Sequence, residues 1–139
     1  MTRGWLFAGF WLGVAAPLAG QGTLADAAQR ARQAWLAHDV QALVAQSTTV
    51  SVELPEASPS APLTRAQAAE VLRRHLGSAS ERTLEVISLS EVEPGVRGFM
   101  ELRRTYAVSG TAEPRRETLF FGFRRVGTEW VLTELRSAP

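Results

Sequence analysis

The sequence is informative first for what it lacks. Its 139 residues contain no cysteine, which excludes thiol catalysis, thiolate metal sites and a disulfide framework. Lysine is absent too, because all 15 basic residues are arginine, so Schiff-base catalysis and a P-loop lysine are excluded. The net charge is only +1, and no strong field of one sign favours nucleic acid as a partner.

Histidine and aspartate are scarce. Only His38 and His75 could supply an imidazole, and no carboxylate stands at ligand spacing beside either of them. We therefore expect no metal site and no cofactor. The only aspartates, Asp26 and Asp39, each stand at the start of an expected helix, where a carboxylate can cap free backbone N–H groups or face the positive end of the helix dipole.

What remains is typical of one globular domain. Hydrophobic residues make up 45% of the chain and charged residues 21%, which argues against general disorder. A chain of this length can bury a core large enough to be stable without metal or disulfide bonds. We expect residues 23–139 to form this domain.

Residues 1–22 differ from the rest of the chain. Arg3 precedes an uncharged apolar run, residues 4–20, that ends in small residues. This pattern is typical of a secretory signal peptide, although no clean small-x-small cleavage site follows it. A retained anchor is the alternative, in which residues 4–20 form a helix of about 25 Å in the ~30 Å hydrocarbon core. Both interpretations place residues 23–139 outside the cytoplasmic membrane, anchored or soluble in the periplasm.

Hydrophobic periodicity predicts helices in the first half of the domain. Leu24, Ala28, Ala31 and Trp35 recur at helical spacing within residues 23–39, and a short helix is expected over residues 40–46. A third helix is predicted over residues 63–76. Its start has the spacing of a capping box, in which Thr64 and Gln67 each satisfy a backbone N–H of the other.

Period-2 patterns predict the strands. One strand is expected at residues 48–54, and four consecutive strands follow the third helix, at residues 83–92, 96–109, 115–126 and 129–136. The turns between these four are short, which favours antiparallel pairing of neighbours. The predicted fold class is α+β, with a curved antiparallel sheet that forms a cone around a long helix, preceded by the hydrophobic N-terminal segment.

This order of elements resembles the nuclear transport factor 2-like superfamily, also called the SnoaL-like or cystatin-like α+β roll. The resemblance rests on the first helix with its ending Trp-Leu-Ala-His-Asp at residues 35–39, the elements at 40–46, 50–54 and 63–76, and the closing Gly-Thr-Glu-Trp-Val-Leu at 127–132. It covers roughly residues 23–136 and is strongest for small exported members of unknown function. The superfamily includes ketosteroid isomerase and dehydratases, and also members that only bind a ligand or partner, so the resemblance implies the fold and leaves the activity open.

The isomerase members need a carboxylate base inside the cone, and we find none at a matching position: both aspartates are assigned to helix starts, and Glu53 alternates outward. We therefore predict no catalytic residues. A small apolar ligand in the cone would contact four residues that we expect to face inward, and these are Trp35, His75, Arg104 and Tyr106.

Three arginine pairs, 103–104, 115–116 and 124–125, follow the strands, and alternation places one member of each pair on the outer face. We expect the outer members to form a basic stripe beside Glu101, Glu117 and Glu134. The residues predicted for an interface are Arg103, Arg115, Arg125 and Phe120, with a partner protein or a second copy of the chain against this sheet face. The predicted function is that of a non-catalytic, exported or membrane-anchored binding domain, an accessory subunit of a membrane or envelope complex. The alternatives are a cone-pocket enzyme of the isomerase or dehydratase type and a periplasmic carrier of small ligands.

Overall fold

The computed structural model describes residues 22–55 and 62–139. The elements follow in the order α1 (Leu24–Leu36), α2 (Val40–Leu43), β1 (Thr49–Glu53), β2 (Leu63–Thr64), α3 (Arg65–Leu76), β3 (Ala79–Glu93), β4 (Arg97–Val108), β5 (Arg115–Val126) and β6 (Glu129–Ala138). No helix in these two ranges is long and apolar enough to cross a membrane. The predicted signal peptide or anchor lies, except for Gly22, outside the described residues.

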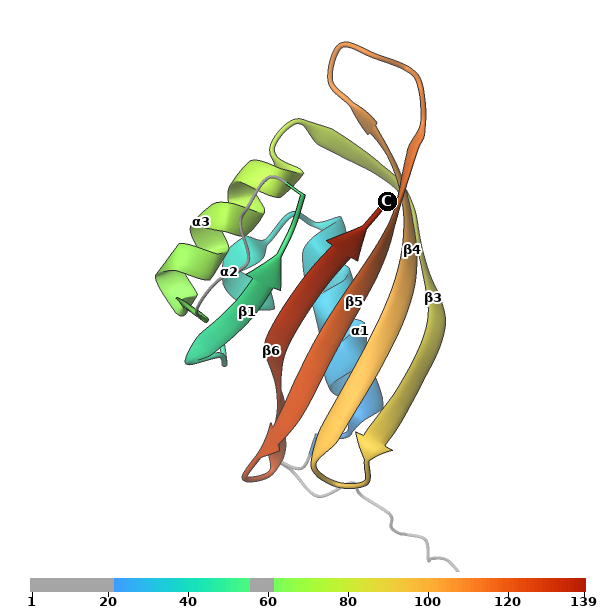
Figure 1. The fold of residues 1–139 in the computed structure, drawn as a ribbon. Coiled ribbons are helices and arrows are strands. Elements are labelled where there is room, and N and C mark those ends of the chain that lie inside the picture. Colours follow the sequence, from blue (N-terminus) through green and yellow to red (C-terminus); the bar gives the residue numbers. More distant parts are fainter. Residues whose placement is uncertain (1–21, 56–61) are drawn as a thin grey trace, which may run out of the picture.

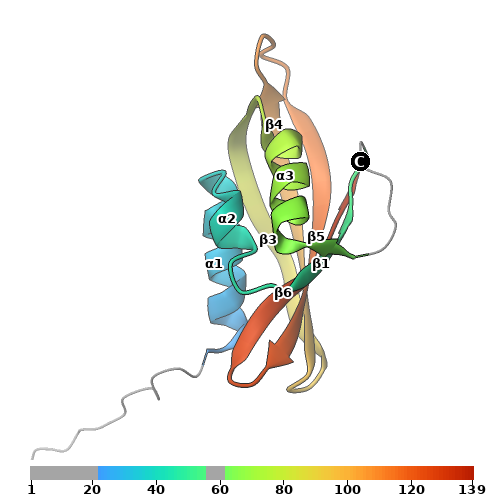
Figure 2. The same ribbon diagram turned by 90° about the vertical axis from the view of Figure 1, so that its left-hand side faces the viewer.

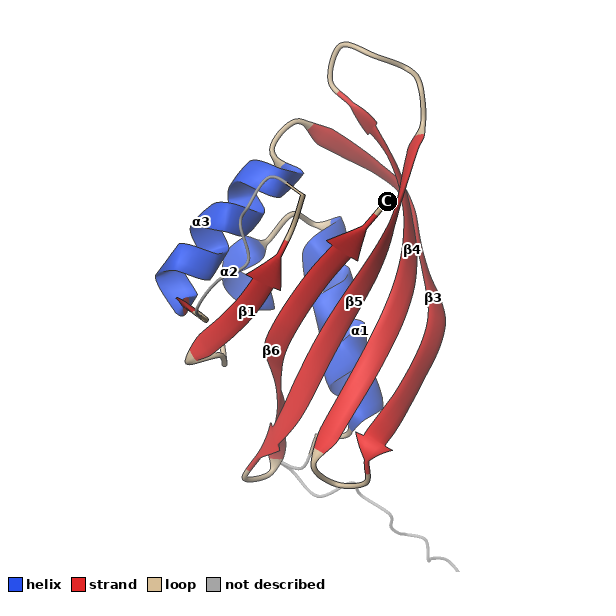
Figure 3. Cartoon of the chain, viewed as in Figure 1, coloured by secondary structure: helices blue, strands red, loops and turns tan. Residues whose placement is uncertain are grey.

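The strands form one curved sheet in the order β2-β1-β6-β5-β4-β3, and the three helices lie on one of its faces (Figures 1, 2 and 3). Strands β3 to β6 pair antiparallel with their sequence neighbours, as their short turns predict. The expectation of an entirely antiparallel sheet was wrong, because β1 pairs parallel with β6. The segments from β2 to β5 separate these two strands in the sequence, and β6 then returns the chain to a position beside β1.

Side-chain caps fix the starts of the helices. Thr23 accepts a hydrogen bond from the Asp26 N–H. Asp39 accepts one from the Ala42 N–H, as predicted. The capping box at Thr64 is confirmed in both directions. Helix α2 ends at Leu43, earlier than expected.

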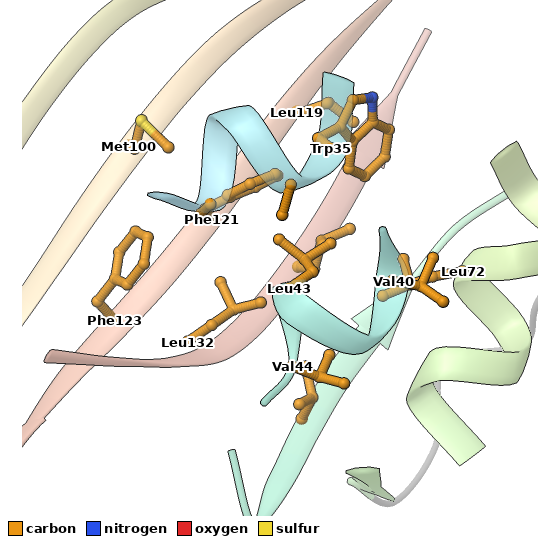
Figure 4. Close-up of a cluster of buried hydrophobic side chains, with 14 of the residues drawn as sticks. Trp35, Val40, Leu43, Val44, Leu72, Met100, Leu119, Phe121, Phe123 and Leu132 are labelled. Atoms are coloured by element: carbon orange, nitrogen blue, oxygen red, sulfur yellow. The ribbon is translucent and has the colours of Figure 1, made fainter. Parts of the chain in front are cut away.

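The core lies between the helices and the concave face of the sheet (Figure 4). Trp35 of α1 contacts Phe121 of β5, with 5.8 Å between their ring centroids. Aliphatic side chains from every layer surround this pair, including Val40, Leu43, Val44, Leu72, Met100, Leu119 and Leu132. Phe121 and Phe123 both point inward, and Phe120 points to the opposite face. The predicted helical stripe that carries Trp35 therefore contributes to this core.

Gly98 permits the close approach of β4 to the start of α1. A Cβ atom at this position would lie 2.5 Å from a methyl carbon of Leu24, whose side chain is buried. We expect Gly98→Ala to lower the free energy of unfolding by about 1–3 kcal/mol, because the buried Leu24 side chain has to move. Urea denaturation measures this loss.

The double variant Gly98→Ala/Leu24→Ala is the control for this prediction, because it removes the group that clashes. If the contact is the cause, the two substitutions together should cost less than the sum of the single losses. Additive losses would contradict the explanation.

Candidate functional site

A group of charged side chains lies inside the fold where α1, α3 and the strands β3, β4 and β5 meet. Arg104 of β4 is at its centre and is 0% exposed. Its Nε donates to Glu81 Oε1 of β3 at 2.8 Å, and its Nη1 donates to Glu117 Oε1 of β5 at 2.7 Å. His38 and His75 contact the outer ends of the two carboxylates. These five residues are called the Arg104 network below.

The two histidines hold the network to the helices. His75 Nε2 of α3 lies 3.0 Å from Glu117 Oε2, which also accepts a hydrogen bond from Ser137 Oγ of β6. His38 Nε2 lies 3.0 Å from Glu81 Oε2. The His38 backbone has φ 56°, a left-handed conformation uncommon for a side chain with a Cβ, and this conformation places it in the turn between α1 and α2.

Aromatic rings enclose the guanidinium. The Cζ of Arg104 lies 3.8 Å from the ring centroid of Tyr106 and 5.1 Å from that of Trp35, within the range of cation–π attraction. Trp35 Nε1 also donates to Glu81 Oε1 at 3.1 Å. The ring centroids of Trp35 and His75 are 6.1 Å apart. The structure thus brings together all four residues predicted to line the cone, while their binding of a ligand stays a prediction.

The surroundings keep both carboxylates ionised. Burial alone would raise the pKa of Glu117, but hydrogen bonds from His75, Ser137 and Arg104 outweigh it and lower the pKa to about 2. Burial also opposes ionisation of Glu81, and its contacts with Arg104, His38 and Trp35 lower its pKa nevertheless. Burial would lower the pKa of Arg104, yet the two glutamates raise it. The three central groups are therefore one cation held between two anions.

A separate cleft of about 460 Å³ opens between α1, α2 and the strands β5 and β6. None of its lining residues belongs to the Arg104 network. The lining residues are Ala27, Arg30, Ala31, Gln33, Ala34, Ala37, Asp39, Ala42, Leu43, Ala45, Gln46, Ser47, Phe123, Trp130 and Leu132. Its volume is within the range of small-molecule sites in proteins.

The sequence matches no protein-family model and no curated protein. Solved structures are similar in fold. A ketosteroid isomerase-like protein from Erwinia carotovora atroseptica superposes with a TM-score of 0.67 at 17% identity, over 87% of this chain and 98% of that one. An NTF2-like protein of unknown function from Pseudomonas putida gives 0.63 at 12% identity, over 81% and 80%. A DUF4783 family protein from Bacteroides uniformis gives 0.65 at 14%, over 78% and 93%.

The chain has the nuclear transport factor 2-like fold. The resemblance drawn from the order of helices and strands is therefore confirmed at the level of the fold. Identities of this size show the fold alone, and the chemistry of the chain has to be judged from its own side chains.

Within this nuclear transport factor 2-like fold, the expectation that no carboxylate faces inward was wrong. Glu81 and Glu117 both lie inside, and the predicted place of Glu117 on the outer face was an error. The alternation of residues along β5 could have shown that Glu117 faces inward, because Glu117 lies two residues before Leu119 and four before Phe121, which both face inward. Glu81 was missed because the third strand was expected to begin at Thr83, whereas β3 begins at Ala79.

The four residues predicted for an interface do not share one face of the nuclear transport factor 2-like sheet. Arg103 is exposed on the outer face, 3.7 Å from Glu85, and Phe120 points to the same face. Arg115 has the parity of the inward Glu117. Arg125 pairs in register with the buried Trp130, and its Cζ lies 5.9 Å from that ring.

An aromatic pair lies on the outer face of β4 and β5. No described helix covers this face (Figure 1). Phe99 and Phe120 stack with 6.1 Å between ring centroids. The Arg136 Cζ lies 4.7 Å from the Phe120 centroid and 5.8 Å from that of Phe99. Phe99, Phe120 and Arg136 are called the outer aromatic group below, and sequence analysis had identified only Phe120 among them.

Proposed function

We propose that this chain is a non-catalytic binding domain that acts outside the cytoplasmic membrane as an accessory subunit of a larger membrane or envelope complex. The observation that supports a non-catalytic role most directly is the Arg104 network. A general base works best when its pKa is near the ambient pH, and a carboxylate with a pKa of about 2 is a weak base. Arg104 is engaged by two carboxylates and is fully buried, so it has no donor directed at a substrate.

The outer aromatic group supports a partner-binding role. Aromatic and arginine side chains are enriched at the centres of protein interfaces, and here they lie together on the uncovered side of the sheet. Arg103 lies on the same face. We propose that a partner protein, or a second copy of the chain, contacts Phe120 and Arg103 on this face.

A specific observation favours the second candidate, a cone-pocket enzyme or a carrier of small ligands. The His38 side chain is 29% exposed and meets the Glu81 carboxylate, so that an imidazole and an acid lie together near the surface. Tyr106 is partly exposed beside them. A small ligand would contact this exposed edge of the Arg104 network.

Gentle detergent extraction of the tagged full chain, followed by identification of co-purifying proteins, tests the partner-binding proposal. We expect a defined partner to be retained by the wild type and lost from Phe120→Thr, which keeps a good strand former on the outer face. Val126→Thr is the matched control, because Val126 is an exposed valine at the end of the same strand and away from the outer aromatic group. It should retain the partner.

Purification of the wild type as a lone chain, with or without its first ~20 residues, would contradict the proposal and favour the ligand-binding alternative. If the wild type retains a partner and Phe120→Thr does not, the loss supports the proposal only when the urea midpoint of Phe120→Thr matches that of the wild type. Equal urea midpoints separate loss of an interface from loss of the fold.

The proposed location rests on the N-terminal segment of the sequence. Amino-terminal sequencing of the protein from membranes distinguishes a cleaved signal peptide from a retained anchor. A start near Gln21 indicates cleavage, and an intact Met1 indicates the anchor. Recovery of the chain from the cytoplasmic fraction with Met1 intact would contradict both forms.

A further inference from the structure

We propose that the cleft between α1, α2 and β6 binds a small amphiphile with an apolar body and one carboxylate, such as a medium-chain fatty acid. This site is separate from the partner surface proposed above, because helices α1 and α2, which contribute to its lining, lie on the other face of the sheet (Figure 2). The Arg104 network does not contribute to it.

The shape of the cleft indicates a small and largely apolar occupant. Its volume of about 460 Å³ fits a small molecule, and its floor is formed by the aromatic rings of Phe123 and Trp130 with the side chains of Leu43 and Leu132. Along α1 the wall consists of three alanines, Ala27, Ala31 and Ala34, together with Arg30 and Gln33, and the small alanine side chains leave space above the rings. A chain of methylene groups placed there would remove apolar surface from water, with about 0.8 kcal/mol gained for each buried CH₂.

Two polar side chains of the lining, Ser47 and Asp39, already have partners. Ser47 is 1% exposed, and its Oγ donates to the Leu132 carbonyl at 2.6 Å. Asp39 is the only acid in the lining, and its carboxylate accepts the Ala42 N–H at the start of α2. These groups are committed to the fold, which leaves the floor suited to an apolar body.

Arg30 gives the cleft its preference for an anion. It lies three residues after Ala27 and four before Ala34, so it stands on the same side of α1 as two alanines of the wall. Among the described residues, Arg30 has no hydrogen bond or ion pair. A guanidinium is a preferred partner of a carboxylate because it can donate two parallel hydrogen bonds. The headgroup of the occupant would therefore lie at Arg30 and its chain over Trp130.

Isothermal titration calorimetry of the full chain with three ten-carbon probes tests this assignment. Decanoate, decanol and decyltrimethylammonium share one apolar body and differ in charge. We expect decanoate to bind with about tenfold higher affinity than decanol, since a charge-assisted pair at the rim is added to the same apolar contact. Decyltrimethylammonium should bind more weakly than decanol.

Two pairs of variants locate the site. Ala42→Phe places a ring in the cleft from an exposed position of α2 and should abolish binding of all three probes, whereas Ala66→Phe on the exposed side of α3 should leave binding unchanged. Arg30→Gln should remove the preference for decanoate over decanol without loss of decanol binding. Arg82→Gln, at an exposed position of β3, should preserve that preference.

Several results would overturn the proposal. One is the absence of decanoate binding to a folded wild type, and another is binding that Ala42→Phe leaves intact, which would place the probe elsewhere on the chain. Equal or tighter binding of decyltrimethylammonium would assign the headgroup preference to Asp39 in place of Arg30. Because Phe120→Thr does not touch the cleft, its decanoate affinity should equal that of the wild type, so failure of one proposal can be distinguished from failure of the other.

Discussion

Arg104→Met is expected to lower the free energy of unfolding by about 3–5 kcal/mol. The substitution leaves Glu81 and Glu117 buried without the cation that both contact, and a buried charge that loses its partner is strongly destabilising. A domain of this size is typically stable by about 5–15 kcal/mol, so this loss is a large fraction of the total. Urea denaturation at neutral pH, with the wild type in parallel, measures it.

The triple variant Arg104→Met/Glu81→Gln/Glu117→Gln is the control for unpaired charge. It removes both anions together with the cation and should recover part of the lost stability, because a neutral amide is much less costly to bury than a carboxylate. The matched surface variant is Arg103→Met, whose side chain is 57% exposed and 3.7 Å from Glu85. It should cost less than about 1 kcal/mol. A loss of this small size for Arg104→Met would contradict a structural role for the network.

Acid is expected to destabilise the protein between pH 4.5 and pH 2 through Glu117. Its pKa is lowered from 4.5 to about 2 in the folded state, so over this range the unfolded chain binds a proton that the folded chain does not. The stabilisation is fully present above pH 4.5 and is lost as the pH falls toward 2. Its size follows from the shift, about 3 kcal/mol at 1.36 kcal/mol for each pKa unit. Urea midpoints measured at intervals from pH 7 to pH 2 give the profile.

Glu117→Gln removes this contribution and should flatten the profile below pH 4.5, although it also lowers stability at neutral pH. Glu81 contributes in the same direction, since its pKa is lowered as well, so the flattened profile should retain some slope. Glu85→Gln is the matched control, because Glu85 is an exposed glutamate of β3 in the same sheet. A Glu117→Gln profile parallel to that of the wild type would show that this carboxyl is not the acid-sensitive group.

The fold was largely predictable because its elements follow strong periodic patterns and recognisable caps. Residues 115–126 were assigned to a strand with the bounds that β5 has, and the capping box at Thr64 was identified from two residues. Pairing of β1 with β6 was not predictable in this way. The direction of that pairing depends on how far the segments between Glu53 and Glu129 carry the chain, and no local pattern encodes it.

The site was predictable in part. Alternation along β4 placed Arg104 on the inner face together with Tyr106, and the helical stripes supplied Trp35 and His75. The counter-charges were missed, although a fully buried arginine requires them. The three charges come together because of the register between strands. Arg104 lies opposite Glu117 of β5, and Glu81 of β3 lies opposite Tyr106, two residues after Arg104. Register of this kind depends on strand starts, the least certain part of a sequence-based assignment.

The pairing of β1 with β6 also affects the order in which the molecule can assemble. Ribosomes make the chain from its amino end, so β1 must wait for β6, and Glu117 receives the Ser137 hydroxyl only when that strand is in place. Contacts between such distant residues close large loops, and folding rates fall as the sequence separation of contacts grows. The core therefore closes only after β6 has been made, and until then the edge of β1 that pairs with β6 stays open.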